Sequence, residues 1–122
     1  MYKVIFYRES SGKIPVLEYI EKLAASKSKD DRVKLHKIQD YIKALGQYET
    51  MAGLPYVKHL DGDIWELRPI RDRILFAGVV GGQYVLLHSF VKKTQKTPSC
   101  EIEKAKREFA DFKERSELYE YN

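Results

Sequence analysis

The chain has 122 residues, of which 43% are hydrophobic and 33% are charged, and its formal net charge is +4. This length suits one domain with a single core, over residues 1–122, and leaves no room for a deep cleft between two domains. No apolar run approaches the roughly 20 residues that a membrane helix needs. The N-terminal sequence MYKVIFYRE is also too short and too charged for a signal peptide. We therefore expect no membrane contact.

The single cysteine, Cys100, excludes an internal disulfide and suits a reducing compartment, so we expect a cytoplasmic protein. The positive charge is uneven along the chain. Residues 51–100 carry 7 basic and 4 acidic residues, whereas residues 101–122 carry 5 basic and 7 acidic residues. This distribution favours an anionic partner for the central segment, although a solvated surface would explain it too.

The N-terminal half predicts one strand and two helices. Residues Tyr2–Tyr7 alternate as a strand does, and Pro15 suits the first position of a helix that runs to about Ala25. Ser28 can cap a second helix, which Gly46 closes. The apolar residues of this second helix recur with helical spacing at Leu35, Ile38, Ile42 and Leu45.

The stretch Gln47–Asp63 has turn signals and no clear period, so we expect a loop there. Three β-rich runs follow, with the polar pair Arg71-Asp72 in the first turn and Gly81-Gly82 in the second. The expected strands are Ile64–Ile70, Arg73–Val80 and Gln83–Val91.

Thr97-Pro98 opens a last helix, whose apolar positions include Ile102, Ala105 and Phe109. The predicted order is β-α-α-β-β-β-α. This order indicates an α+β fold with an antiparallel sheet, two N-terminal helices on one face and a C-terminal helix elsewhere.

Strand alternation separates the residues of the first β-rich run. Trp65 and Leu67 share one face and are most simply core, whereas Glu66 and Arg68 share the face that apolar packing does not bury. Arg73 opens the next strand and should lie close to Arg68 across the turn. A Glu–Arg cross-strand pair would explain this pattern without any function. A phosphate site becomes the better explanation because further cations follow the third strand at Lys92, Lys93 and Lys96.

Several segments in a fixed order resemble the RelE/HigB-type toxins of bacterial toxin–antitoxin systems, in their phage-derived, HigB-like branch. They are WELRP from Trp65, RILF from Arg73 and LLHSFVKKTQKTP from Leu86, followed by the helix that contains Glu101 and Ala105. The resemblance covers nearly the whole chain. It implies a compact RNA-cleaving fold, cleavage of messenger RNA at the ribosome, and inhibition by a small helix-turn-helix antitoxin of the HigA type. DNA contact would then occur only through the antitoxin.

RNA cleavage without a metal requires deprotonation of the 2′-OH, stabilisation of the pentacoordinate phosphate and protonation of the leaving oxygen. Arg73 and Arg68 suit the second task because a guanidinium binds phosphate oxygens bidentately. The resemblance assigns Lys92 and Lys93 to the basic end of the last strand, where they would hold the RNA backbone or stabilise the leaving group. Glu66 is the nearest carboxylate for the base, and the choice of acid and base stays open.

Around these residues we expect an RNA-binding set. It comprises Lys58, His59, His88, Phe90 and Lys96. His59 is expected in a loop, and His88 is expected to be half-buried and hydrogen-bonded. The three histidines lack metal-ligand spacing and one cysteine cannot complete a zinc site, so no metal or other cofactor is predicted.

A second class of function stays open, namely a non-catalytic module that binds RNA or a protein through the same basic sheet. Such a binder would lose affinity gradually as cations are removed, whereas a nuclease would lose cleavage on one substitution. The antitoxin of a toxin could cover the basic face or block access to the ribosome from elsewhere. The sequence shows no groove suited to an acidic partner, which favours obstruction away from Arg73.

Overall fold

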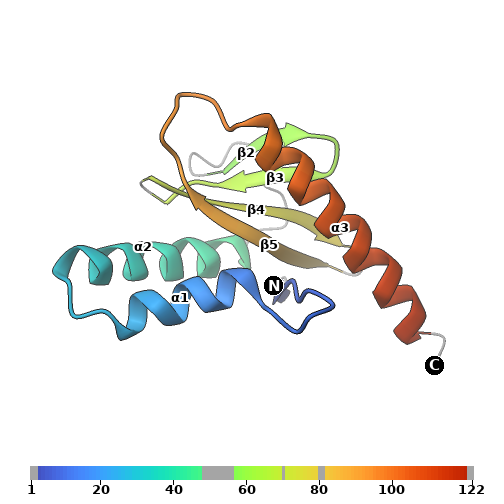
Figure 1. Cartoon of the computed structure of the whole chain (residues 1–122), viewed down its shortest axis with the longest axis horizontal. Coiled ribbons are helices and arrows are strands. Elements are labelled where there is room, and N and C mark those ends of the chain that lie inside the picture. Colours follow the sequence, from blue (N-terminus) through green and yellow to red (C-terminus); the bar gives the residue numbers. More distant parts are fainter. Residues whose placement is uncertain (1–2, 48–56, 70, 80–81, 121–122) are drawn as a thin grey trace.

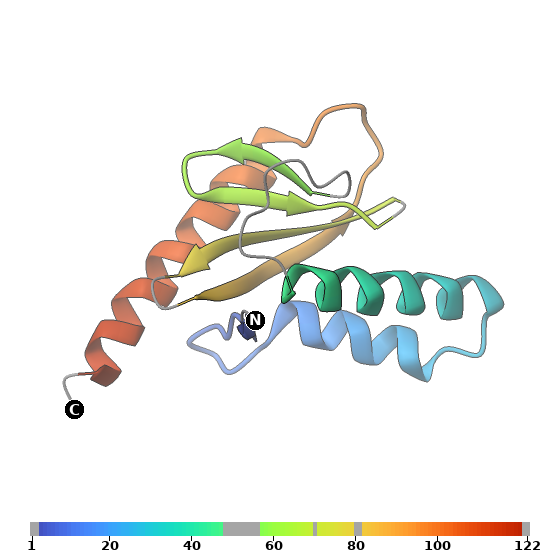
Figure 2. The same ribbon diagram turned by 180° about the vertical axis from the view of Figure 1, so that it is seen from behind.

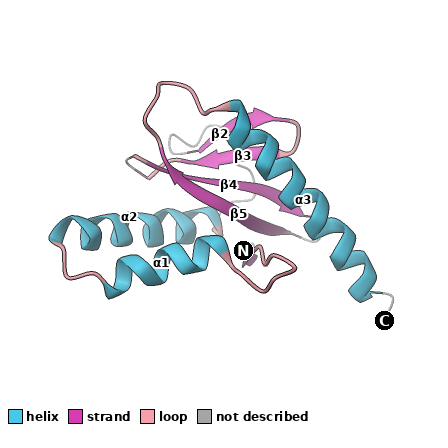
Figure 3. Ribbon diagram, in the orientation of Figure 1, coloured by secondary structure: helices cyan, strands magenta, loops and turns pink. Residues whose placement is uncertain are grey.

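The computed structural model describes residues 3–47, 57–69, 71–79 and 82–120, with side chains as far as residue 116. Three helices and one five-stranded sheet make up this part of the chain (Figures 1 and 3). In chain order the elements are β1 (Lys3–Phe6), α1 (Pro15–Ala25), α2 (Lys29–Leu45), β2 (Val57–Asp61), β3 (Ile64–Leu67), β4 (Asp72–Val79), β5 (Gln83–Val91) and α3 (Ser99–Glu120).

The predicted α+β class is confirmed, and the sheet is mixed. Its strand order is β1-β5-β4-β3-β2, and every neighbouring pair is antiparallel except β1 and β5, which run parallel. The prediction of a wholly antiparallel sheet is therefore wrong at one edge. Alternation along a strand shows which residues share a face, but it carries no information on the direction of the neighbouring strand.

Strand β2 lies inside the stretch predicted to be a loop, which is a second correction. Its sequence VKHLD is short, and Lys58 and His59 are exposed, so it lacks the apolar alternation of the other strands. The turn signal at Asp61-Gly62 is real, because Gly62 has a φ of 56° and joins β2 to β3. Residues 48–56, which include the other predicted turn signals, lie outside the described residues.

The boundaries of the other elements agree closely with the sequence, except that β3 ends at Leu67, before the predicted end at Ile70. Pro15 occupies the first turn of α1, and the hydroxyl of Ser28 caps α2 by accepting from the Asp31 backbone N–H at 3.4 Å. Gly46 closes α2, with its N–H donating to Ile42. In the β4–β5 turn, Gly82 has a φ of 76°, which a glycine adopts readily. Gly81, Val80 and Ile70 lie outside the described residues.

The sheet is covered on both faces by separate apolar clusters. On one face, Ile38 and Leu45 of α2 and Val16 of α1 pack with Leu67 and Phe76. On the other face, Ala105 and Phe109 of α3 pack with strand residues such as Ile64, Leu75 and Leu87. The α1–α2 hairpin lies to one side of the sheet in both views, while α3 crosses it and runs past its edge (Figures 1 and 2). The N-terminal part of α3 therefore lies over the sheet, whereas its C-terminal part extends beyond the sheet edge (Figures 1 and 2).

Candidate active site

A buried carboxylate lies at the centre of the predicted site. Glu66 of β3 is completely buried, and its Oε1 lies 3.6 Å from Nε of Arg68 and 3.7 Å from Nε of Arg73. The prediction that Glu66 lies on an unburied face is wrong, because α3 and its preceding loop cover this face beyond the apolar cluster. The proximity of Arg68 and Arg73 is confirmed, with Glu66 between them.

Arg73 is held rigidly although it is charged. Only 8% of the residue is exposed, and its Nη1 donates a 2.8 Å hydrogen bond to the backbone carbonyl of Asp72. Burial lowers the pKa of Arg73; the charge of Glu66 opposes the shift and that of Arg68 adds to it. An arginine stays protonated under all ordinary conditions, so the site holds a fixed buried cation.

Two lysines belong to the same electrostatic neighbourhood. Lys58 of β2 lies directly opposite Glu66 in the β2–β3 register, so both side chains emerge on the same face of the sheet. The pKa of Lys92 is lowered by desolvation; Glu66 opposes this effect, whereas repulsion from Arg73, Arg68 and Lys58 adds to it. Four cations, Lys58, Arg68, Arg73 and Lys92, thus lie around Glu66, and we call these five residues the cation cluster. Asp72 is a second carboxylate that acts on Arg73, so positive charge remains in excess.

The β3–β4 turn that carries both arginines is braced from behind by α1. The hydroxyl of Tyr19 donates a 2.6 Å hydrogen bond to Oδ1 of Asp72, which is buried. Burial raises the pKa of Tyr19, and the hydrogen bond to Asp72 raises it further, so the phenol stays protonated and donating. Backbone bonds from Asp72 to Pro69 and from Lys92 to Arg71 close the turn. Arg73 is thereby positioned by both helical and sheet contacts.

The loop between β5 and α3 is tied to the same carboxylate. The hydroxyl of Thr97 donates a short hydrogen bond to Oε2 of Glu66, and Thr94 donates to the backbone carbonyl of Lys96 at 2.6 Å. Lys93 and Lys96 of this loop are exposed. The loop therefore carries two exposed lysines and is attached through Thr97 to the buried Glu66.

The structure separates His88 from the RNA-binding set. A β-bulge at Leu87 turns both Leu87 and His88 toward α3. The His88 ring is only 2% exposed, and its Nδ1 lies 2.5 Å from Glu108 while its Nε2 lies 3.2 Å from Glu101. His88 therefore anchors the start of α3 and is not accessible to RNA, which extends the expectation of a half-buried, hydrogen-bonded residue.

His59 and Phe90 differ in their relation to the cluster. His59 lies in strand β2 and not in a loop, opposite Trp65, with ring centroids 4.9 Å apart. It therefore faces away from Glu66, because neighbouring residues of a strand alternate between faces. Phe90 pairs with Arg73 across β4 and β5 and is half-buried at the margin of the site.

Sequence reasoning missed Thr97 and the pair formed by Tyr19 and Asp72. Thr97 follows Glu66 by 31 residues and Tyr19 precedes Asp72 by 53, so no local spacing links either pair. The only local signal was the TP dipeptide, which predicted the start of a helix.

No group of three or more histidine, cysteine, aspartate or glutamate residues in the described part of the chain is placed to hold a metal ion. Within the same residues, no helix is long and apolar enough to cross a membrane.

Comparisons with known proteins were made for the whole chain. No curated protein matches it. The profile of the phage-derived protein Gp49-like family (DUF891) matches residues 18–110, which is more than half of the chain and includes every residue of the cation cluster. That family is a RelE/HigB-like toxin family associated with toxin–antitoxin systems. Because this match covers more than half of its residues, the chain belongs to the Gp49-like family.

Proposed function

We propose that this protein is the toxin of a toxin–antitoxin pair and that it cleaves messenger RNA on the ribosome by attack of the ribose 2′-OH. One observation carries the proposal: a fully buried Glu66 lies between Arg68 and Arg73, with Lys58 and Lys92 beside it. Family membership supports the toxin class. We also propose that the protein is of the HigB-like branch, that it acts at the ribosome and that it works in the cytoplasm.

In this proposal Arg73 and Arg68 bind the scissile phosphate. The pentacoordinate phosphate carries more negative charge than the ground state, so fixed donors lower its free energy most. Arg73 is preorganised, because burial and its bond to the Asp72 carbonyl restrict its motion. Arg68 is more accessible, with 36% of its side chain exposed, which suits a group that contacts the bound backbone from the solvent side.

Glu66 acts in this scheme as a positioning residue for the two arginines. Its Oε2 accepts from Thr97, whereas its buried Oε1 lies 3.6 and 3.7 Å from the two guanidiniums and accepts no hydrogen bond in the described part of the chain. In the same scheme Oε1 of Glu66 accepts the proton of the 2′-OH as the new 2′-oxygen–phosphorus bond forms, once the RNA displaces an arginine contact.

Lys92 is our candidate for protonating the leaving 5′-oxygen. Desolvation and neighbouring cations lower its pKa, so its ammonium gives up a proton more readily than an ordinary lysine. Lys93 and Lys96 are exposed and would contact the RNA backbone on either side. Phe90, half-buried beside Arg73, would contact a base or ribose at the margin.

The test uses purified protein, programmed ribosomes and a chelator that removes zinc and manganese but leaves ribosomal magnesium. We expect messenger RNA to be cleaved, with 2′,3′-cyclic or 3′-phosphate ends, because the 2′-OH is the nucleophile. Products with 3′-hydroxyl ends, or activity restored only by added zinc or manganese, would contradict the mechanism. RNA binding without cleavage, lost gradually as cations are removed, would favour the non-catalytic module.

A further inference from the structure

His88 is a buried titratable side chain that the proposed reaction does not use. Its ring lies between two carboxylates of α3: Nδ1 is 2.5 Å from Oε1 of Glu108, and Nε2 is 3.2 Å from Oε1 of Glu101. His88 is 2% exposed and Glu108 is 7% exposed, whereas 24% of the Glu101 side chain is exposed. We call these three residues the histidine cluster.

Hydrogen-bond chemistry fixes the number of protons in the histidine cluster. A neutral imidazole has one N–H donor and one acceptor nitrogen, and an ionised carboxylate only accepts. Two ionised carboxylates can therefore both be bonded only to an imidazolium, which donates from both nitrogens. Since an imidazole is more basic than a carboxylate, the additional proton belongs on the ring. The intact cluster thus holds one proton more than a neutral imidazole beside two carboxylates.

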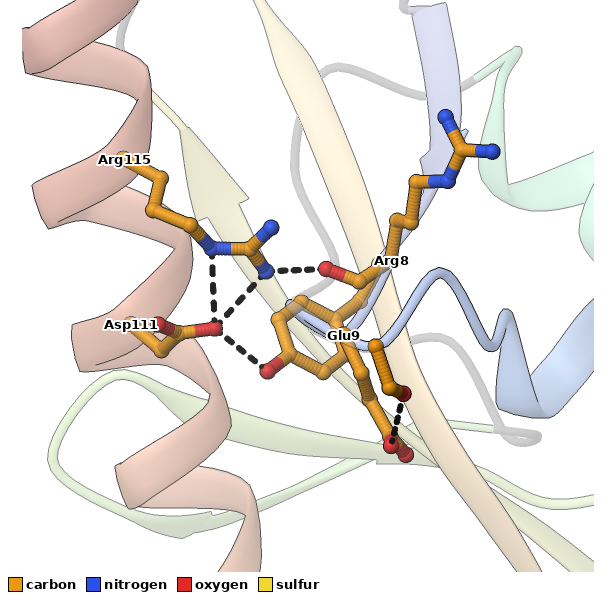
Figure 4. Close-up of polar contacts among 6 residues, drawn as sticks. Arg8, Glu9, Asp111 and Arg115 are labelled. Carbon is orange, nitrogen blue, oxygen red and sulfur yellow. Dashed lines mark hydrogen bonds and ion pairs between the residues drawn. The ribbon is translucent and has the colours of Figure 1, made fainter.

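The other charged groups around the histidine cluster leave this count unchanged. Leu75 of β4 lies opposite His88, and Arg73 of that strand lies opposite Phe90. Beyond Glu108 is a cavity of about 420 Å³, which Glu108 lines together with Tyr7, Glu9, Ser10, Lys104, Arg107 and Asp111. Asp111 is bonded to Tyr7 and Arg115 (Figure 4). The two cations of the cavity are matched by two further carboxylates, so the carboxylates in contact with the ring decide its charge.

The histidine cluster holds the turn of α3 that follows the active-site loop. Glu101 lies in the first turn of α3, and its backbone N–H donates a 3.0 Å hydrogen bond to the carbonyl of Pro98. Pro98 follows Thr97, whose hydroxyl donates to Oε2 of Glu66. A continuous path of contacts therefore runs from His88, through the first turn of α3, to the carboxylate between the two arginines.

A second path from His88 to the site runs along β5. Phe90 follows on the same face of the strand, and the two ring centroids are 6.2 Å apart. Phe90 lies opposite Arg73 in the β4–β5 register. His88 thus lies directly behind the residues assigned to the scissile phosphate and to a flanking base or ribose.

We propose that the histidine cluster is a positioning unit of the active site, and that the proton it holds makes RNA cleavage depend on pH. The proposal rests on the proposed function, because it concerns the rate of that reaction. Loss of the proton leaves one carboxylate facing a lone pair of the ring, so that contact breaks. Glu101 is the carboxylate released, because it is the more exposed and has the longer contact. Thr97, Lys93 and Lys96 then lose part of the support of their loop.

The direction of the effect follows from linkage. Above about pH 6.5 a free imidazole is mostly neutral, so the intact cluster binds more protons than the released one. The ordered loop is therefore favoured at low pH and is lost as the pH rises. Ionisation of the 2′-OH and of Lys92 also changes the rate with pH, so each variant is compared with the wild type at the same pH.

The experiment compares Glu101→Gln with the matched control Glu103→Gln in single-turnover cleavage. A glutamine amide can donate to Nε2 of a neutral ring, so Glu101→Gln keeps the contact without the additional proton. The Glu103 side chain is 60% exposed and lies 3.6 Å from Lys106. The rate ratio of Glu101→Gln to wild type should rise at least about fivefold between about pH 6 and about pH 9. The ratio for Glu103→Gln should change by less than about twofold.

Glu101→Ala tests the positioning role with the opposite signature. It removes the contact at every pH, so at about pH 6 it should cleave at least about fivefold more slowly than wild type, and at about pH 9 the two rates should converge. Circular dichroism checks that the variant is folded. A readout independent of cleavage is the ¹⁵N signals of the His88 ring, which should remain those of an imidazolium to a higher pH in the wild type than in Glu101→Gln.

Each other outcome has a distinct meaning. A rate ratio for Glu101→Gln that does not change with pH would overturn the role of the proton. Full activity of folded Glu101→Ala at about pH 6 would overturn the positioning role and leave the proposed function standing. A wild-type chain that cleaves no RNA at any pH would overturn the proposed function, and with it the positioning role. The ring-nitrogen signals would then still decide whether the histidine cluster holds its additional proton.

Discussion

Both ends of α3 lie beside a carboxylate that accepts a hydroxyl hydrogen bond and faces arginine, but the two sites differ in their charge balance. Before its first turn, Thr97 donates a hydroxyl hydrogen bond to Glu66, which faces two arginines. Near its last turns, Tyr7 donates a hydroxyl hydrogen bond to Asp111, which pairs with Arg115. The first carboxylate is fully buried, whereas 37% of the Asp111 side chain is exposed.

This difference shows how burial and charge count separate a reactive cluster from a structural one. At Asp111 one arginine balances one carboxylate, so the contact is satisfied and has no excess charge for a phosphate. At Glu66 two arginines and two lysines lie near one carboxylate, with Asp72 as a second carboxylate behind Arg73, so positive charge exceeds negative charge and favours an anion. Both ends hold α3 in place, but only the first is prepared for chemistry on RNA.

Replacing Arg73 with alanine should have the largest effect. Losing one preorganised donor to the developing phosphate charge costs about 10²–10³ in rate, which is enough to abolish growth arrest. Cleavage of ribosome-bound messenger RNA measures the loss, and circular dichroism checks folding. Arg32→Ala on α2 is the control and should stay fully active. Growth arrest by a folded Arg73→Ala variant, undiminished, would sink the assignment of the site.

Thr97→Val should reduce activity by about 10-fold through Glu66 and the loop that carries the lysines. The substitution leaves one buried carboxylate oxygen without its donor, and a hydrogen bond to a charged group contributes about 1.5–3 kcal/mol. Single-turnover cleavage and thermal unfolding separate the two effects. Thr97→Ser restores the hydroxyl and should restore the rate. A loss of stability with unchanged cleavage would make Thr97 a merely structural contact.

Tyr7→Phe removes the corresponding hydroxyl at the other end of α3 and should leave cleavage unchanged. Because Asp111 keeps Arg115 and has access to water, we expect a loss of only about 1 kcal/mol in the free energy of unfolding. Urea denaturation at neutral pH measures it. A fall in cleavage comparable to that of Thr97→Val would erase the distinction between the two clusters.

The smallest expected effect is the pH dependence of the difference in the free energy of unfolding between wild type and Tyr7→Phe. Burial, helped by the bond to Asp111, raises the pKa of Tyr7 from 10.0 to about 12, so the folded state favours the protonated phenol. The stability contributed by Tyr7 is therefore complete below pH 10.0 and is lost as the pH rises to about 12. The advantage of wild type over Tyr7→Phe should shrink across that range, by about 1 kcal/mol or less after solvent screening.

At acid pH the hydrogen bond between Tyr7 and Asp111 should also contribute less to stability, but here the loss occurs as the pH falls. The bonds from Tyr7 and Arg115 lower the pKa of Asp111 below its ordinary 3.8, so its contribution is present above that value and is lost as the pH falls through the lowered pKa. Urea denaturation of wild type and Tyr7→Phe at matched pH values measures both limbs. The double variant Tyr7→Phe/Asp111→Asn lacks both titrating groups, so its free energy of unfolding should show neither the acid nor the alkaline loss. A loss that persists in this variant would assign the titration to another group.

The sequence by itself determined the helices, the central strands and the composition of the cation cluster. Pro15, Ser28 and Gly46 mark helix boundaries through backbone effects that act within one turn, so they can be read locally. The alternation in β3 likewise placed Glu66 and Arg68 on one face, and the short β3–β4 turn brought Arg73 beside them. Local rules suffice for these residues because their partners are close in the chain.

Only the tertiary structure decided what covers that cluster and which residues leave it. Strand β2 forms because β3 offers it a free edge, although VKHLD has weak strand character of its own. Register then directs Lys58 toward Glu66 and His59 away from it. A bulge in β5 and the packing of α3 bury His88, and Thr97 reaches Glu66 across 31 residues. These outcomes depend on contacts between elements distant in the chain, where sequence spacing carries no geometric information.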